Sequence, residues 1–312
     1  MTLQSFRNTF AGNPLDRVSE RRSDPEWVAG RLADADSLAV AIWNGKPLVE
    51  SDGSGGVRIA YFPAELAKEL SGGEERLLFL GMWREQAVFA LDIEGSADPA
   101  EGPLRGVGAF EDLRAISLRL VPADAAILAT AKQMFEWRRR HRFCASCGQP
   151  SDAVDGGWKR RCRACGVEHF PRTDPVVIML PYFGDRCMVG RGASWPEGRY
   201  SALAGFLEPG ETIEEACARE LHEEAGLRTV RVHYHSTQPW PYPSSLMIGL
   251  LAEVADDQAA PDQTELSEVR WFTREEARAL LDGEIADATA PGQMAIAHQL
   301  LRAWVDGGSP GD

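Results

Sequence analysis

The sequence predicts an α+β (α/β) protein with more than one domain. Its 312 residues, of which 44% are hydrophobic, can bury more than one core. Apolar runs of strand length alternate with glycine-rich breaks, and two longer segments carry apolar residues at helical spacing. This mixture of periods indicates sheets that pack against helices.

The charge and the apolar stretches limit the classes of protein. A net charge of -14 argues against a general nucleic-acid binder, which is normally basic. Met1–Phe10 lacks the pattern of a secretory signal, and the longest apolar stretch, Pro175–Phe183, is too short to span a bilayer. We therefore expect a soluble, cytoplasmic protein.

Residues 1–122 are expected to form an N-terminal scaffold or dimerisation domain of mixed strands and short helices. The strand-length runs are Ser37–Trp43, Leu77–Gly81 and Ala87–Asp92, and breaks such as Ser51–Gly56 separate them. No motif in this region carries chemistry by itself, and the chain shows no internal repeat.

Residues 123–142 are expected to form a linker helix that Pro122 opens. Apolar residues recur there at helical spacing, and the helix ends in the basic run Arg138–Arg142. Basic side chains complement the C-terminus of a helix, which explains the run without a ligand. Contact with an anionic substrate is the functional alternative.

Residues 143–170 are expected to form a zinc ribbon. Two CxxC pairs, each followed by glycine, are separated by fourteen residues, a spacing that is typical of zinc sites. Four thiolates leave no open coordination position, so the Zn²⁺ is expected to be structural. A nucleic-acid role for the nearby Lys159–Arg163 is the alternative. The predicted ligands are Cys144, Cys147, Cys162 and Cys165, whereas Cys187 and Cys217 are expected to be buried and inert.

The segment Gly205–Leu227 is predicted to be a turn that leads into a helix. Pro209 and Gly210 favour the turn, Thr212 and Glu215 form a capping box, and Gly226 ends the helix. Glu220, Glu223 and Glu224 then lie on one face of this helix. Clustered carboxylates repel one another and are ligands for Mg²⁺ or Mn²⁺, which can neutralise a pyrophosphate and activate water. A solvated acidic helix face is the alternative.

The same segment reads G-x5-E-x7-R-E-U-x-E-E-x-G-U, where U is a bulky aliphatic residue, and it resembles the Nudix box at every specified position. The resemblance implies a Nudix hydrolase domain over residues 171–305, with a mixed sheet between helices. It also implies hydrolysis of a nucleoside diphosphate linked to another group. Glu220, Glu223 and Glu224 would hold the metal with the carbonyl of Ala204, while Arg219 and Glu211 would complete the catalytic set by holding the box together.

A proline-rich aromatic segment, Thr237-Gln-Pro-Trp-Pro-Tyr-Pro-Ser-Ser245, follows the box. Such a rigid aromatic wall suits stacking on a nicotinamide or adenine ring. The segment resembles the SQPWPFPxS array of the NADH pyrophosphatase (NudC) family, except at Thr237 and Tyr242. That family also carries a four-cysteine zinc ribbon before its Nudix domain. The resemblance implies cleavage of NAD(H) to nicotinamide mononucleotide and AMP, removal of NAD caps from RNA, and a homodimer.

The resemblance also carries over binding residues. Glu265 matches a further metal ligand, and Gly157 stands where the family has an acidic substrate contact. The implied substrate-binding residues are Arg114, Phe170, Phe206, Gln238, Pro239, Trp240, Pro241, Tyr242, Pro243, Ser244, Ser245 and Ala295.

Three points stay open at this level. The substrate of the same enzyme class can instead be ADP-ribose or a diadenosine polyphosphate. The chain can also be a non-catalytic zinc-ribbon and Nudix nucleotide sensor. The clusters Arg138–Arg142 and Lys159–Arg163 are candidates for contact with the phosphates of an NAD-capped RNA. The tail, residues 306–312, is expected to be disordered.

Overall fold

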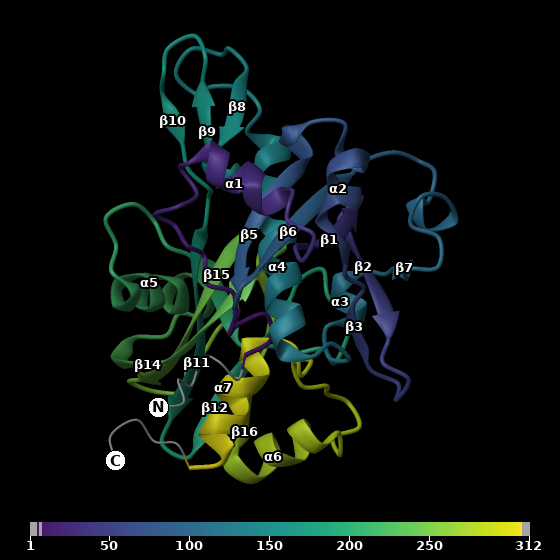
Figure 1. Cartoon of the computed structure of the whole chain (residues 1–312). Coiled ribbons are helices and arrows are strands. Elements are labelled where there is room, and N and C mark those ends of the chain that lie inside the picture. The colour runs from purple at the N-terminus through teal and green to yellow at the C-terminus, as the bar shows by residue number, and fades with distance from the viewer. Residues whose placement is uncertain (1–4, 6–7, 308–312) are drawn as a thin grey trace. The chain divides into compact units, whose positions relative to one another are not determined.

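A computed structural model describes Ser5 and residues 8–307 of the chain (Figure 1). The described chain divides into two compact units. The N-terminal unit comprises Phe10–Thr173 together with Trp240–Ser244, and the C-terminal unit comprises the other described residues. The prediction for the tail falls mostly on residues 308–312, which lie outside the described residues, and Asp306 and Gly307 form a turn.

The C-terminal unit is built on one mixed sheet. Its strands run in the order β14-β15-β11-β12-β16, with β13 paired to β11, and β11 pairs in parallel with β15. The strands are β11 (Asp174–Phe183), β12 (Arg186–Gly192), β13 (Leu203–Phe206), β14 (Thr229–Trp240), β15 (Ser245–Val254) and β16 (Leu266–Thr273). The helices are α5 (Ile213–Ala225), α6 (Arg274–Asp282) and α7 (Ile296–Val305).

Helices cover both faces of this sheet (Figure 1). Along β11, Val177 and Met179 pack in the core that contains α5, while Ile178 and Leu180 pack in the core that contains α6 and α7. Successive side chains of a strand point to opposite faces, so an unbroken apolar run is what a sheet buried on both faces requires. The predicted mixed sheet between helices is therefore confirmed.

The N-terminal unit is built on a second mixed sheet, in the order β3-β2-β1-β6-β5, with β4 paired to β1 and β7 paired to β2. The strands are β1 (Leu38–Trp43), β2 (Lys46–Ser51), β3 (Val57–Ile59), β4 (Phe62–Pro63), β5 (Leu77–Trp83), β6 (Gln86–Ile93) and β7 (Ala109–Phe110). The α-helices are α1 (Pro25–Leu32), α2 (Ala64–Ser71), α3 (Leu113–Ile116) and α4 (Pro122–Arg140), and the 3-10 turns are η2 (Glu74–Arg76), η3 (Pro99–Glu101) and η4 (Asp155–Gly157).

The two sheets share one topology. In the N-terminal unit, the first strand, β1, pairs antiparallel with β2 and with the short strand β4, and parallel with β6. In the C-terminal unit, the first strand, β11, pairs antiparallel with β12 and with the short strand β13, and parallel with β15. In both units the short strand is followed by a helix. In each unit the strand after the parallel one returns to pair with the second strand. By this order α2 corresponds to α5, and α4 to α7. The fold thus contains a structural repeat where the sequence shows none.

The helix predicted to open at Pro122 begins there and ends at Arg140, two residues before the predicted end. The two isolated cysteines are buried as predicted, Cys187 in β12 and Cys217 in α5. Burial raises the pKa of both thiols to about 12, so neither is a thiolate at neutral pH.

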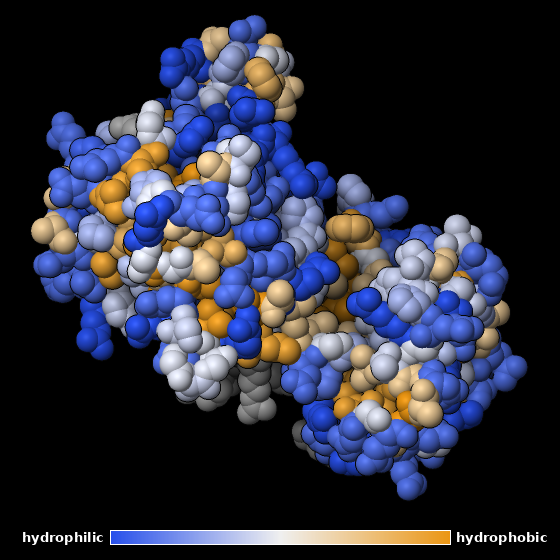
Figure 2. Space-filling model, turned by 90° about the vertical axis from the view of Figure 1, so that its right-hand side faces the viewer, coloured by the Kyte–Doolittle hydropathy of each residue, from blue (hydrophilic) through white to orange (hydrophobic). Residues whose placement is uncertain are grey.

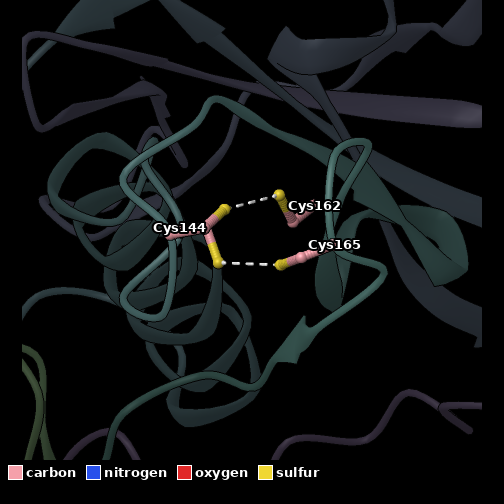
Figure 3. Close-up of side chains that lie close together, drawn as sticks. Cys144, Cys162 and Cys165 are labelled. Carbon is pink, nitrogen blue, oxygen red and sulfur yellow. Dashed lines mark hydrogen bonds between the residues drawn. The ribbon is translucent and has the colours of Figure 1, made fainter.

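The four remaining cysteines face one another at the end of a small three-stranded sheet (Figure 3). Its strands are β8 (Ser151–Val154), β9 (Lys159–Cys162) and β10 (Glu168–His169). The sulfur atoms of Cys144 and Cys165 lie 3.6 Å apart, and those of Cys147 and Cys162 lie 3.5 Å apart. Sulfurs at Zn–S distances of about 2.3 Å in a tetrahedron stand roughly 3.8 Å from one another, so the quartet fits one Zn²⁺.

Hydrophilic residues cover most of the face in Figure 2, and apolar residues gather in smaller patches between them. Among the described residues, no helix is long and apolar enough to cross a membrane.

We predict one tightly held Zn²⁺ per chain. Cys162→Ser is expected to lower the zinc content, measured by elemental analysis, to below about a tenth of an ion, because a tetrahedral site rarely survives the loss of a thiolate. The matched variant Cys187→Ser should keep its zinc. Equal zinc contents in the two variants would contradict the assignment.

Candidate active site on the α5 helix

The predicted box folds as a turn and a capped helix. Thr212 and Glu215 form the expected capping box at the start of α5, and Gly226 ends the helix with a left-handed φ of 68°. Ala216, Cys217 and Leu221 lie on the buried side of α5 in the core of the C-terminal unit. Packing of this apolar side fixes the rotation of the helix and thereby the direction of its glutamates.

Arg219 binds three of the box carboxylates at once. Its Nε and Nη2 donate to the two oxygens of Glu211 at 2.6 and 2.9 Å, and its Nη1 donates to Glu220 at 2.8 Å and to Glu223 at 3.0 Å. Nη2 also donates to the carbonyl of Phe206. The Arg219 guanidinium, with the amide of Glu208, holds the pKa of Glu211 at about 2. Arg219 and Glu211 therefore tie the turn to the helix.

Glu224 is the carboxylate that Arg219 does not reach. It is 5% exposed, and its Oε2 is buried without a hydrogen-bond partner. Burial, and after it the charges of Glu220, Glu265, Asp262 and Glu223, raise the pKa of Glu224 to about 8. An ionised carboxylate at this position needs a cation that no described side chain supplies.

Glycine at position 205 makes room for Glu220. A Cβ at Gly205 would lie 1.8 Å from the carboxyl carbon of Glu220 and 2.0 Å from its Oε1. The predicted ligand Ala204 is exposed on β13, paired with Ile178 of β11 and one residue before this contact. The backbone of β13 at Ala204 and Gly205 therefore lies beside the Glu220 carboxylate of α5.

Glu265 belongs to a loop that is hydrogen-bonded to Glu224. The amide of Asp262 donates to the carbonyl of Glu224 at 3.0 Å, and the Asp262 carboxylate accepts from the amides of Glu265 and Leu266. This arrangement brings an exposed Glu265 close enough to raise the pKa of Glu224. Sequence reasoning missed Asp262, because nothing in the local pattern distinguishes it from a surface acid.

The segment after the box is divided between two environments. Gln238 is 1% exposed, and its amide donates to the carbonyls of Thr9 and Met294 and accepts from the amide of Ile296. This side chain therefore bonds to the backbone on both sides of Ala295, the N-cap residue of α7. Pro239 is the last residue of β14 in this unit, and Ser245 pairs with Asp174 where β15 begins.

Residues 240–244 form an aromatic cluster in the N-terminal unit. Trp240 and Tyr242 meet edge to face at 5.4 Å, Phe10 packs on both rings, and the Arg114 guanidinium lies 4.3 Å from the centre of the Tyr242 ring. The peptide bond between Tyr242 and Pro243 is cis. The structure thus brings Arg114 against the rings of Trp240 and Tyr242, two other residues of the implied substrate-binding set. The other two members of the segment are Pro241, which separates Trp240 and Tyr242 in the sequence, and Ser244, which is 7% exposed.

The two isolated stacking candidates are exposed. Phe206 at the end of β13 is 61% exposed, and Phe170 after β10 is 65% exposed, with the ammonium of Lys159 5.4 Å from its ring centre. Both rings are therefore available to a ligand. Gly157, where the family has an acid, has φ +94°, and a Cβ there would lie 3.1 Å from Arg138 Nη1 and from a methyl group of Leu78. The backbone therefore favours glycine at this position.

Much of the two basic clusters serves structure. Arg138 is 4% exposed and donates to the carbonyl of Leu77, and Arg160 is 2% exposed and bonds to Ser151. Arg139, Arg140, Lys159, Arg161 and Arg163 each pair with a carboxylate. In the described chain, Arg142 alone of these cations is exposed without such a pair.

The four cysteines are the one group of possible metal ligands in the described chain whose ligand atoms all lie within 4.8 Å of one another. The glutamates of the box do not form a second such group, because Arg219 holds Glu220 and Glu223 while Glu224 lies apart from it. The carboxylates of Glu211, Glu220 and Glu223 therefore surround the Arg219 guanidinium.

Comparison with known proteins agrees with this architecture. Three family models match consecutive parts of the chain: the NADH pyrophosphatase-like rudimentary NUDIX domain over residues 36–137, the NADH pyrophosphatase zinc ribbon domain over residues 139–170, and the NUDIX domain over residues 172–290. The first of these matches explains the repeated topology, since it assigns a reduced Nudix fold to the N-terminal unit.

The chain is similar over most of its length to curated proteins. It is 33% identical to the human NAD-capped RNA hydrolase NUDT12, over 97% of this chain and 74% of that protein. It is 33% identical to the Mycobacterium bovis NAD-capped RNA hydrolase NudC, over 93% of this chain and 94% of that protein. It is 35% identical to the human mitochondrial NAD(P)H pyrophosphatase NUDT13, over 72% of this chain and 69% of that protein. Together with the complete box and the cysteine quartet, these matches show that the chain belongs to the NADH pyrophosphatase (NudC) family of Nudix hydrolases.

Proposed function

We propose that this enzyme hydrolyses the pyrophosphate of NAD(H) to nicotinamide mononucleotide and AMP, and that it also removes NAD caps from RNA 5′ ends. The observation that carries the proposal is the complete carboxylate set of α5, in which Glu224 is buried and lacks a counter-charge. A sensor that binds nucleotides without cutting them has no need for a second buried glutamate on this helix. The NAD-related names of the relatives favour NAD(H) over ADP-ribose or diadenosine polyphosphates.

The residues of the site fit a divalent cation of the hard type. All the donors are oxygens, the set that Mg²⁺ and Mn²⁺ prefer. Glu224 Oε2 lacks a partner, and Gly205 leaves a recess against which the Glu220 carboxylate rests. We propose that Glu220, Glu223, Glu224, Glu265 and the carbonyl of Ala204 hold the catalytic metal.

A bound divalent cation supplies charge neutralisation for the pyrophosphate and lowers the pKa of a coordinated water. The protein residues do the positioning. Arg219 and Glu211 hold the turn before α5, and Asp262 holds the loop that presents Glu265. A glutamate of the box accepts the proton of the attacking water at one of its carboxylate oxygens.

We propose that Trp240 and Tyr242 stack on the bases of the dinucleotide, with the Arg114 guanidinium fixing the Tyr242 ring. Phe170 and Phe206 are exposed rings that suit the same task. Gln238 acts by positioning, since its side chain is fully engaged around Ala295. We also propose that the enzyme is a cytoplasmic homodimer, by analogy with its family.

Glu224→Gln is predicted to abolish turnover. With NADH and either Mg²⁺ or Mn²⁺, we expect kcat to fall by more than about a thousandfold, because the variant loses a metal ligand at the reacting centre. Glu214→Gln, an exposed glutamate in the first turn of the same helix, should keep at least half the wild-type rate. Binding of NADH without turnover by the wild type would favour a sensor, and a higher kcat/KM for ADP-ribose would change the substrate.

The stability of the zinc-loaded enzyme without Mg²⁺ or Mn²⁺ is predicted to fall as the pH rises from 6 to 8. The pKa of Glu224 is about 8 in the folded state and ordinary in the unfolded state, so the unfolded state releases its proton first. The resulting destabilisation of the folded state is absent below the ordinary pKa of a glutamate. It grows as the pH rises and levels off above about pH 8. It amounts to about 2 kcal/mol between pH 6 and 8.

Denaturant unfolding of Glu224→Gln and Glu214→Gln at the two pH values measures this contribution. We expect Glu224→Gln to lose it and Glu214→Gln to keep it. If the free energy of unfolding of the two variants changes equally between the two pH values, the pKa of Glu224 is not raised in the folded state.

A further inference from the structure

A cavity of about 700 Å³ lies within the N-terminal unit, among residues of α1, α2, β5, β6 and the zinc ribbon. All the lining residues belong to that unit, and the set contains none of the residues assigned to the box or to the aromatic cluster. Its volume is in the range of about 300–1,000 Å³ that small-molecule sites occupy. The cavity is therefore large enough for a ligand the size of a mononucleotide.

The floor and one wall of the cavity are apolar. Phe79, Phe89 and Leu77 of the sheet form the floor, and all three are buried in the core of this unit. Val28 and Leu32 of α1 form the wall, and both are only partly buried although they pack on the core of this unit. Apolar side chains that a core leaves half-covered favour an apolar or aromatic ligand body.

The charged residues of the lining are mostly basic, which is unusual in a chain with a net charge of -14. One carboxylate, Asp155, lines the cavity against four cations: Arg22, Lys68, Lys159 and Arg161. Two of these cations have partners, since Lys159 pairs with Asp155 at 3.5 Å and Arg161 pairs with Glu168.

The other two cations, Arg22 and Lys68, have no ion pair with a described carboxylate. The guanidinium of Arg22 lies 4.5 Å from the ring centre of Trp158, which fixes its plane. Its Nε and Nη1 are buried and have no hydrogen-bond partner among the described residues. Buried donors without a partner are costly, and a guanidinium in this state favours an oxygen anion such as a phosphate or a carboxylate.

The helix beside the cavity lacks a metal site. The left-handed glycines Gly72 and Gly226 end α2 and α5, and aligning the two helices on them places Leu66, Glu69 and Leu70 at the positions of Glu220, Glu223 and Glu224. Two of the three metal-binding glutamates are thus leucines in the N-terminal unit. A ligand in this cavity would be bound and not hydrolysed.

We propose that the cavity binds an amphipathic organic anion, with its apolar or aromatic body against Val28 and Leu32 and its phosphate or carboxylate head at Arg22 and Lys68. The ligand class follows from the pairing of an apolar wall with two cations that have no ion pair. Nucleoside monophosphates and medium-chain carboxylates share this chemistry, and direct competition distinguishes them.

The test uses the full-length, zinc-loaded protein and the amphipathic anion 1-anilinonaphthalene-8-sulfonate, whose fluorescence reports binding. Lys68→Glu is expected to weaken binding at least tenfold. Lys46→Glu makes the same charge change at an exposed lysine of the same unit that does not line the cavity, and it should alter Kd by less than twofold. Ala29→Trp, on the exposed part of the lining, should block binding by filling the entrance.

Competition with the fluorescent probe identifies which class of amphipathic anion the cavity binds. Displacement of the probe by AMP supports a nucleotide ligand, and displacement by decanoate supports an acyl ligand. Melting temperature and zinc content confirm that each variant is folded. Equal losses in Lys68→Glu and Lys46→Glu, or unchanged binding in Ala29→Trp, would overturn the proposal.

Discussion

Three glutamates on one side of a single helix, two of them nearly buried, are the constraint around which the C-terminal unit is organised. Arg219 offsets two of these charges and ties them to Glu211. Glu224 is left over, and burial beside like charges raises its pKa to about 8. A buried carboxylate without a partner is unfavourable in any folded protein, and it is retained where a cation completes it. The glycine at position 205, the capped start of α5 and the Asp262 loop all serve to hold this cluster.

The same fold occurs twice in the chain, but only the C-terminal copy carries the three glutamates on its helix. In the C-terminal unit, a loop of six residues separates β13 from α5, and this loop carries Glu211. In the N-terminal unit, α2 begins at the residue directly after β4, so no loop remains to hold such a group. The carboxylates have also become leucines at two of three positions. Loss of the loop and of the acids together leaves a sheet and helix frame that is free to serve another ligand.

Much of the catalytic half could be predicted because its signals are local. The capping box of Thr212 and Glu215, the glycine at 226 and the apolar side of α5 are fixed by residues within one or two turns, and each appears where the sequence predicts it. The cysteine quartet is similar, since its spacing reflects the geometry of one ion. The run of apolar residues in β11 also predicts a sheet covered on both faces.

Other features depend on contacts between distant residues. Gln238 is chemically suited to a ligand, yet its amide is consumed by Thr9, Met294 and Ile296. Arg138 belongs to a basic run that suggests RNA, yet the structure buries it against Leu77. The repeat is invisible in the sequence because pairing order, and not residue identity, is what the two units share. Such features need tertiary contacts that single-sequence patterns do not contain.

The most direct measurement is a Mn²⁺ titration of the zinc-loaded enzyme, followed by the electron paramagnetic resonance of free Mn²⁺. If the box carboxylates hold the metal against Gly205, Gly205→Ala will weaken Mn²⁺ binding at least tenfold, because the new methyl group displaces the Glu220 carboxylate. Gly30→Ala, at a glycine with open space around it, will bind as the wild type does. Unchanged Mn²⁺ binding in Gly205→Ala would contradict the central claim that these carboxylates form the metal site.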